Sequence, residues 1–262
     1  MQKIDIHSHV LPQIDDGSQS WEETMDMVYQ AYETGTTEIA ITHHILRESD
    51  FALEDEIIEK FEDLKTRLRS AHIPVRLHLG SELYYQPDLN LDHKIATYNN
   101  NGVYFLVEFP MQTIPRYVDE KFFEFIIDGK KPILAHPERN VGIIENPMRA
   151  YEFVQRGVYL QINSGSLTGD YGERVRQTAI ALLNARLVHF VGSDGHNTDR
   201  RPLIIQNAYE IIVENWGERY ATALFQDNPR KAMAGEMLKI PEPQPVEMPK
   251  RRKMGLLRRL GF

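Results

Sequence analysis

The sequence contains no cysteine. This absence excludes disulfide bonds, zinc sites built from thiolates and every mechanism that needs a thiolate nucleophile. The sequence also has no apolar stretch as long as the roughly 20 residues of a membrane-spanning helix. Its amino-terminal residues, MQKIDIHSHV, lack the long apolar region and small-residue cleavage site of a signal peptide. We therefore expect a cytoplasmic protein.

Basic charge is scarce outside the carboxyl terminus. The 262 residues carry a net charge of −8, but the last thirteen, KRRKMGLLRRLGF, hold six of the 30 basic residues and no acidic one. The other 249 residues carry 24 basic against 38 acidic side chains, a net charge of −14. Phosphate contacts need a basic surface, so this acidic body argues against nucleic acid as a partner.

Short apolar runs alternate with longer amphipathic segments, a pattern typical of an α/β fold with a parallel sheet. A closed, barrel-like sheet and an open, doubly wound one both fit this pattern. Ser20 and Glu23 have the spacing of a capping box at the start of the first helix. The predicted helices span 20–33, 53–71, 118–127, 147–156 and 173–184, with two or three more before residue 240. The seven predicted strands span 3–9, 38–42, 75–79, 103–107, 132–135, 158–162 and 187–192.

A polar residue able to bind a metal or a proton lies at the end of every predicted strand. Because the carboxyl ends of parallel strands meet on one face, we expect these side chains to cluster. Any one of them alone is more often structural. Together, however, several buried carboxylates without a cation would cost several kcal/mol each, so the set predicts a metal site. The residues are His7 and His9, His43 and His44, Glu82, Glu108, His136, Asn163, and Asp194 with His196.

The segment IDIHSHVLPQIDDG shows how such a site begins. Side chains two positions apart on a strand point the same way, so His7 and His9 can hold one ion. Asp16 follows the strand end and can reach a neighbouring ion, while Glu82 can bridge two ions at about 3.5–4 Å. Imidazole and carboxylate ligands without sulfur suit manganese, iron or zinc.

Eight stretches in one order connect these residues to a known family. They are IDIHSHVLPQIDDG, GSELYY, VEFPM, AHPER, QINSGS, GSDGHN, RRP and DNPRK, spread over residues 4–231. Together they resemble the polymerase and histidinol phosphatase (PHP) superfamily, and within it the metal-dependent tyrosine-protein phosphatases of bacterial capsule and exopolysaccharide operons. The resemblance implies a PHP fold, a distorted seven-stranded (β/α)7 TIM-like barrel, over residues 1–240. A proline-rich linker and a basic tail would then occupy residues 241–262.

The resemblance also implies three divalent metal ions, commonly manganese. The first would be held by His7, His9, Glu82 and Asp194, the second by Glu82, Glu108 and His136, and the third by Asp16, His44 and His196. Arg139 and Arg201 would be the catalytic residues that bind the phosphate, a role suited to their always-charged guanidinium groups.

The sequence departs from the family pattern at two positions. His43 stands where the family usually has proline or serine, so either His43 or His44 could be the ligand; the register favours His44. Asn140 stands where a tyrosine often follows HPER.

The function implied is hydrolysis of phosphotyrosine on a partner protein by a metal-activated hydroxide. The expected partner is a tyrosine kinase of polysaccharide assembly. Two alternatives remain: a small-molecule phosphomonoesterase such as histidinol-phosphate phosphatase, and a non-catalytic, metal-bound docking module. A metal-dependent amidohydrolase also begins with H-x-H, but Glu82 and Glu108 occupy the middle strand ends, with no lysine placed to become a carbamate ligand.

The basic tail allows two interpretations. As a simple run of charge it would be solvated. Its arginines, however, are interleaved with Leu256, Leu257, Leu260 and Phe262, which also fits peripheral contact with the inner face of an anionic membrane.

Overall fold

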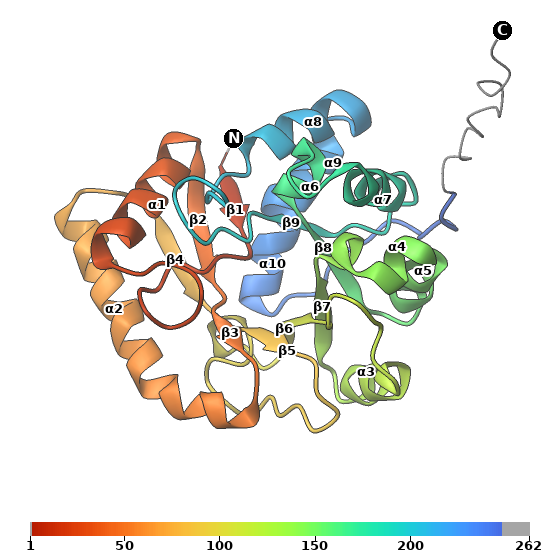
Figure 1. Cartoon of the computed structure of the whole chain (residues 1–262), viewed down its shortest axis with the longest axis horizontal. Helices are drawn as coiled ribbons and strands as arrows, with labels where there is room; N and C mark the ends of the chain where they lie inside the picture. Colours follow the sequence, from red (N-terminus) through yellow and green to blue (C-terminus); the bar gives the residue numbers. More distant parts are fainter. Residues whose placement is uncertain (1, 248–262) are drawn as a thin grey trace, which may run out of the picture.

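The computed structural model describes residues 2–247, which form an α/β fold whose strand pairings are all parallel (Figure 1). This confirms the predicted parallel α/β class. One sheet has the order β1 (Lys3–Asp5), β2 (Thr36–Ile41) and β4 (Arg76–Leu79). The second has the order β3 (His44–Ile45), β5 (Glu82–Tyr84), β6 (Tyr104–Glu108), β7 (Lys131–Ala135), β8 (Tyr159–Asn163) and β9 (Phe190–Gly192).

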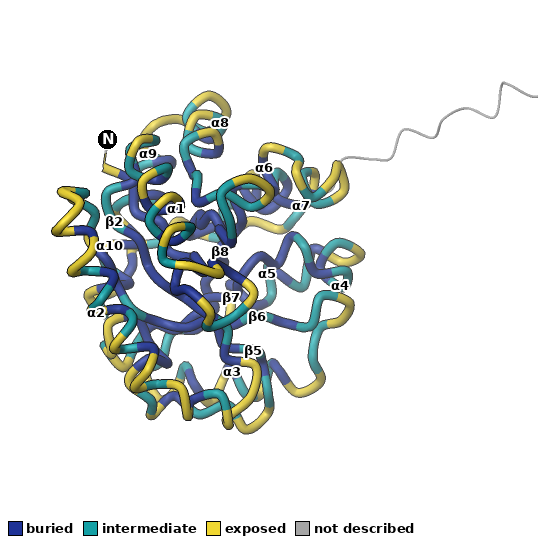
Figure 2. Tube along the Cα trace, turned by 60° about the vertical axis from the view of Figure 1, so that its left-hand side comes forward, coloured by how far each residue is buried: buried dark blue, intermediate teal, exposed yellow. Residues whose placement is uncertain are grey.

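Helices surround the strands and expose their outer sides to solvent (Figure 2). The long predicted helices are confirmed to within a residue or two at each end, whereas the short ones were missed because five residues are too few for a periodic pattern. The α-helices are α1 (Trp21–Glu33), α2 (Glu54–Ser70), α3 (Val118–Ile127), α4 (Val141–Glu145), α5 (Met148–Gln155), α6 (Ser164–Thr168), α7 (Glu173–Asn184), α8 (Gln206–Trp216), α9 (Glu218–Thr222) and α10 (Asn228–Ala234). Three 3₁₀ turns, η1 (Glu48–Leu53), η2 (Tyr98–Asn100) and η3 (Pro137–Arg139), and one π turn, η4 (Ala223–Asp227), complete the described elements.

The start of α1 follows half of the predicted capping box. The Ser20 hydroxyl accepts the backbone N–H of Glu23 at 3.1 Å, as expected for an N-cap residue. The Glu23 carboxylate, however, accepts the N–H of Gln19 at 2.8 Å instead of that of Ser20. The donor of the reciprocal hydrogen bond is therefore the residue before the one that the motif predicts.

Within residues 2–247 the structure has nine strands instead of the seven predicted, because a further short strand follows each of the predicted strands 38–42 and 75–79 after a break. β2 stops at Ile41 and β3 resumes at His44, while β4 stops at Leu79 and β5 resumes at Glu82. The two breaks lie side by side, since the backbone N–H of Glu82 donates to the carbonyl of His43 at 3.0 Å. They place His44 and Glu82 opposite each other in the register of β3 and β5.

A glycine and an aromatic ring accompany the second break. A Cβ atom on Gly80 would lie 3.1 Å from the Tyr98 ring, a tight contact that would require this buried ring to shift by a few tenths of an ångström. The Gly80 N–H still donates to the carbonyl of Ile41 at 2.9 Å, which keeps the neighbouring strands in register.

β1 is shorter than the predicted strand 3–9, but the residues after it remain paired on both sides. The His9 N–H donates to the Gly195 carbonyl at 2.9 Å, beyond β9, and the Thr42 N–H donates to the Ser8 carbonyl at 2.8 Å, beyond β2. These bonds connect the two ends of the strand series around residues 7–9. A closed seven-stranded barrel stays a prediction.

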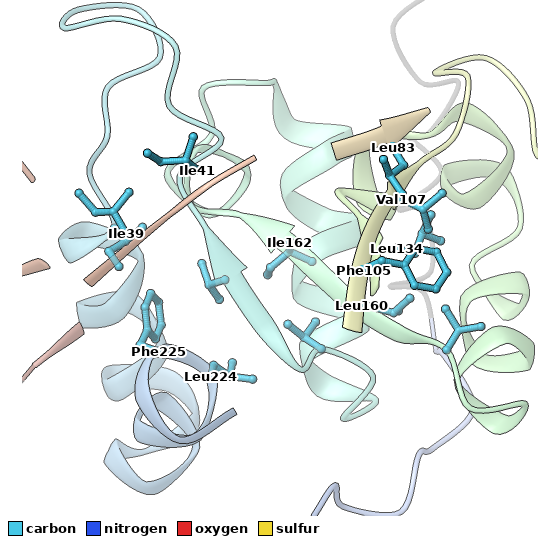
Figure 3. Close-up of a cluster of buried hydrophobic side chains, with 14 of the residues drawn as sticks. Ile39, Ile41, Leu83, Phe105, Val107, Leu134, Leu160, Ile162, Leu224 and Phe225 are labelled. Atoms are coloured by element: carbon cyan, nitrogen blue, oxygen red, sulfur yellow. The ribbon is translucent and has the colours of Figure 1, made fainter. Parts of the chain in front are cut away.

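Alternate residues of the strands divide the core into two clusters. On β6, Phe105 and Val107 belong to the larger cluster (Figure 3). Tyr104 and Leu106, at the alternate positions of the strand, belong to a smaller cluster on the opposite face. Glu108 continues that second face at the end of the strand. The second face is thus apolar where the strands begin and polar where they end, which puts the polar site at the carboxyl ends.

The last described residues, 241–247, form no helix or strand. The Gln244 N–H donates to the Ala185 carbonyl at 2.9 Å, and Val246 packs partly against the larger cluster. The basic tail, including Leu256, Leu257, Leu260 and Phe262, lies outside the described residues, and its boundary at residue 241 stays a prediction. Within residues 2–247, no helix combines the length and the apolar character needed to cross a bilayer.

Candidate metal centre

The structure brings the nine predicted metal ligands together at the carboxyl ends of the strands. They come from different elements, so the fold and not local sequence assembles them. His7, His9 and Asp16 follow β1, His44 begins β3, Glu82 begins β5, Glu108 ends β6, His136 follows β7, and Asp194 and His196 follow β9.

The first group consists of His7, His9, Glu82 and Asp194, the set expected for the first ion. Glu82 Oε2 lies 3.1 Å from His7 Nε2 and 3.3 Å from His9 Nε2. Asp194 Oδ1 lies 3.5 Å from both of these nitrogens. All four side chains are buried, so one cation could be enclosed by two imidazoles and two carboxylates.

The second group combines His9, Asp16, His44 and His196, the set expected for the third ion with His9 in addition. Asp16 Oδ1 lies 3.3 Å from His196 Nε2 and 3.5 Å from His44 Nε2. The Asp16 side chain is 66% exposed, so this end of the cluster opens to solvent.

The third group differs from the set expected for the second ion. His44 Nδ1 lies 3.2 Å from Glu82 Oε2 and 3.4 Å from Glu108 Oε1, so His44, Glu82 and Glu108 are close enough to hold one ion together. His136 Nε2 lies 2.9 Å from Glu82 Oε1 but 3.8 Å from Glu108 Oε2. The assignment of individual ligands to individual ions therefore stays a prediction.

Of the two adjacent histidines after β2, only His44 enters the cluster of described residues. His43 is fully buried, and its Nε2 lies 3.1 Å from the Ser81 hydroxyl. The geometry thus agrees with the register argument for His44.

The tautomers of three histidines suit cation binding. His7 Nδ1–H donates to Gln161 Oε1 at 2.9 Å, His9 Nδ1–H donates to Asp15 Oδ2 at 2.7 Å, and His196 Nδ1–H donates to the Asp194 carbonyl at 2.9 Å. Each bond leaves the Nε2 lone pair directed at the cluster, as in known metal sites.

Three buried atoms in the cluster have no hydrogen bond from the described residues: His44 Nδ1, Glu82 Oε2 and His196 Nε2. The Nε2 atoms of His7 and His9 also lie only 3.1 Å apart, although both are acceptors in the tautomers above. Buried acceptors that face one another are costly unless something positive lies between them. Divalent cations therefore fit this donor set.

Like charges dominate the electrostatics of the cluster. Burial, and then the charges of Glu82 and Asp194, raise the pKa of Glu108 to about 9. Burial would lower the pKa of His9, but the carboxylates of Asp15 and its neighbours outweigh it and raise the pKa well above its ordinary value. Both shifts report excess negative charge that a bound cation would offset.

Sequence reasoning missed two residues that orient the histidines. Asp15 binds His9 and also accepts the backbone N–H of His44 at 2.9 Å. Gln161 binds His7 and donates to Asn163 Oδ1 at 2.9 Å. Asp15 could have been noticed beside Asp16, and Gln161 two positions before the polar end of β8.

The two predicted phosphate-binding arginines meet at one carboxylate oxygen. Arg139 Nη1 lies 2.8 Å and Arg201 Nη2 lies 2.6 Å from Asp194 Oδ2, which also accepts the Asn163 side-chain amide at 2.6 Å. Asp194 has a left-handed backbone with φ of 56°, a conformation that costs a non-glycine residue about 1 kcal/mol or more. Such an outlier is typical of a functional site.

A cavity of about 730 Å³ opens over the cluster. Its polar lining residues include Glu108, His136, Arg139 and Arg201. Its apolar lining residues, called its hydrophobic wall below, are Ile14, Leu46, Leu53, Phe109, Pro110 and Met111. The cavity thus combines charged side chains of both signs with apolar ones.

Asn140, which departs from the family pattern, supports this wall. Its Oδ1 accepts the Ile143 N–H at 3.1 Å and so caps α4, while its Nδ2 donates to the carbonyls of Pro110 and Thr113. Asn140 therefore fixes the loop after β6.

The fold and the site define a class: α/β proteins with parallel strands and a buried cluster of histidines and carboxylates that could bind metal. Within it, the chain belongs to the capsular polysaccharide synthesis family CpsB/CapC, whose model matches residues 3–234. It is 34% identical to the tyrosine-protein phosphatase YwqE of Bacillus subtilis over 257 residues, covering 96% of this chain and 98% of that protein. Identity to the tyrosine-protein phosphatase CpsB of Streptococcus pneumoniae is 33% over 242 residues, or 90% and 100% of the two chains.

A solved structure also matches. It is a chain from the crystal structures of YwqE from Bacillus subtilis and CpsB from Streptococcus pneumoniae, described as unique metal-dependent tyrosine phosphatases. The TM-score is 0.87 at 32% identity, with 93% of this chain and 99% of that chain covered. The predicted resemblance is confirmed.

Proposed function

We propose that this chain is a metal-dependent protein-tyrosine phosphatase that hydrolyses phosphotyrosine on a partner protein. The observation that carries the proposal is the double use of Asp194. Its Oδ1 faces the imidazoles of the predicted metal ligands. Its Oδ2 forms ion pairs with Arg139 and Arg201, which line the same cavity. The names of the similar proteins support the same activity.

The proposed cofactor is a set of three divalent ions, with manganese favoured and iron or zinc as the alternatives. His7, His9, Asp16, His44, Glu82, Glu108, His136, Asp194 and His196 would hold them. Bound there, such ions would lower the pKa of a water molecule and neutralise charge on the phosphoryl oxygens.

Arg139 and Arg201 would bind the phosphoryl group. Their guanidinium groups stay charged at every working pH and match the geometry of phosphate oxygens. Both lie partly exposed in the cavity while anchored to a buried carboxylate, so they are held in place before a substrate arrives. Such preorganised charge stabilises the transition state without reorganisation.

The wall of the cavity would favour an aryl phosphate. Leu46 and Leu53 are 45% and 40% exposed, high values for leucine, and both line the cavity that contains the arginines. A tyrosine ring bound between phosphate and backbone would cover them and remove apolar area from water. A phosphoserine side chain is too short to do so.

The proposed partner is a tyrosine kinase of capsule or exopolysaccharide assembly. The family name, which refers to capsular polysaccharide synthesis, supports this choice. A cytoplasmic location at the inner face of the membrane, through the basic tail, rests on the sequence alone.

Turnover by the metal-loaded wild-type protein tests the activity. We expect hydrolysis of a phosphotyrosine peptide with manganese, loss of activity with a chelator, and weaker turnover of phosphoserine peptide and histidinol phosphate. Preferred turnover of histidinol phosphate would instead support a small-molecule phosphatase. No hydrolysis of any phosphate ester with manganese, iron or zinc would support a docking module and refute the proposal.

A further inference from the structure

Tyr171 lies beside both arginines of the site and is not among the residues that line the cavity over the cluster. The guanidinium carbon of Arg139 lies 4.2 Å from the centre of the Tyr171 ring, and Tyr171 interacts electrostatically with Arg201, beside which it lies. With Arg201, Tyr171 lines a separate cavity of about 90 Å³.

The contacts of Tyr171 compensate for an unfavourable arrangement of charge. Arg139 and Arg201 both reach Asp194 Oδ2, so two positive groups are held close together on one oxygen. The π face of Tyr171 attracts the first cation and its hydroxyl oxygen can accept from the second. One side chain therefore serves both arginines.

The Tyr171 ring is itself fixed from behind. A Cβ atom on Gly165 would lie 3.0 Å from Tyr171 Cε2, so the ring packs directly on the first turn of α6. The loop 169–172 that carries Tyr171 is pinned to the same helix, because the Asp170 N–H donates to the Gly165 carbonyl at 2.9 Å and the Thr168 hydroxyl donates to Asp170 at 2.8 Å. The ring thus has little freedom to move away from Arg139.

We propose that Tyr171 is a positioning residue that holds Arg139 and Arg201 in the orientation that receives the phosphoryl group. This inference rests on the proposed function, in which the two arginines bind phosphate. Tyr171 acts through the arginines and touches neither the substrate nor the cations.

The first test measures binding of inorganic phosphate to the manganese-loaded protein by calorimetry. Tyr171→Phe keeps the ring and loses the hydroxyl, so phosphate affinity should fall about threefold. Tyr171→Leu loses the ring as well, so affinity should fall about tenfold or more. Gly165→Ala should weaken binding too, because its methyl group pushes the ring without changing any charge. Tyr29→Leu, at an exposed tyrosine on α1, is the matched control and should bind phosphate as wild type.

The second test compares turnover of phosphotyrosine and phosphoserine peptides. Both substrates share the phosphoryl group, so kcat/KM should fall by the same factor for both in each Tyr171 variant. Metal content and the thermal midpoint separate this effect from loss of folding. If Tyr171→Leu does not fold, Tyr171→Phe and Gly165→Ala are compared with wild type in its place.

Phosphate binding within about twofold of wild type in correctly loaded Tyr171→Leu would overturn the inference; if that variant does not fold, the same result in both Tyr171→Phe and Gly165→Ala would overturn it. Wild-type protein that binds phosphate but hydrolyses no ester would refute the proposed function and leave the Tyr171 comparison intact. The two failures are therefore distinguishable.

Discussion

Asp194 Oδ2 lies 2.8 Å from Arg139 Nη1, while Oδ1 of the same carboxylate lies 3.5 Å from the Nε2 atoms of His7 and His9. Asp194 thus connects the histidine–carboxylate cluster to the two arginines that we propose as phosphate-binding residues. Because Asn cannot replace a negative ligand, Asp194→Asn should lower kcat with phosphotyrosine peptide about 1000-fold. The protein should stay folded, which circular dichroism would check. Turnover of Asp194→Asn near the wild-type rate with full metal content would contradict the role of this residue.

Asp15 should tune metal affinity without binding metal itself. It fixes the Nδ1–H of His9, and loss of such a partner typically weakens metal binding about 10- to 100-fold. Asp15→Asn should therefore require more manganese for half-maximal loading, measured by titration of metal-stripped protein. Asp26→Asn, at an exposed position of α1, is the control. Equal manganese affinity in the two variants would show that Asp15 is dispensable.

Metal binding should release protons. Burial and the nearby carboxylates raise the pKa of Glu108 to about 9 in the metal-free protein, so this carboxyl is protonated at pH 7.5. A cation needs the deprotonated form, and the same holds for His9, whose pKa is also raised. Metal affinity should therefore increase as the pH rises from 6 towards 9. Calorimetry in two buffers of different ionisation enthalpy measures the released protons; identical heats in both buffers would count against this charge arrangement.

Leu46 and Leu53 should determine preference for an aromatic ester. Leu46→Ala and Leu53→Ala each remove apolar wall from the cavity, so kcat/KM for phosphotyrosine peptide should fall about fivefold to tenfold. Turnover of phosphoserine peptide should not change, in contrast to the Tyr171 variants. Ile127→Ala, at an exposed residue of α3, should affect neither substrate. An equal loss of kcat/KM on both substrates would mean that these leucines do not contribute to recognition of the tyrosine ring.

Away from the site, the pair of Glu38 and His78 should make stability depend on pH. The hydrogen bond from His78, at 2.8 Å, lowers the pKa of Glu38 below its ordinary value of 4.5 despite partial burial. A lowered carboxyl pKa stabilises the fold above pH 4.5, and this contribution is lost as the pH falls through the lowered value. Glu38→Gln should therefore cost about 1 kcal/mol at pH 6 and less at pH 3, measured by urea unfolding. An equal loss of unfolding free energy at pH 6 and at pH 3 would contradict the lowered pKa of Glu38.

The features that could be predicted from the sequence are the long helices, from their apolar periodicity, and the polar residues at the ends of the strands. The buried stripe of Ile57, Phe61, Leu64 and Leu68 located α2 within one residue at each end, because helix packing needs that spacing. Polar strand ends and the family resemblance together singled out the nine predicted ligands, and the structure brings their side chains to one cluster; their binding of metal stays a prediction.

The remaining features depend on contacts between distant segments. The breaks after Ile41 and Leu79 depend on each other and on the Tyr98 ring, and no local pattern encodes that pairing. For the same reason Tyr171 could not be singled out from the sequence, because its contact with Arg139 appears only when the two distant segments are placed side by side.

Anomalous diffraction from crystals of the manganese-loaded protein tests the central claim most directly. The account predicts peaks between the imidazoles and carboxylates of the cluster, about 2 to 2.5 Å from atoms that include His7 Nε2, Glu82 Oε2 and Asp194 Oδ1. Manganese bound elsewhere on the chain, with these three atoms left without an ion, would contradict it.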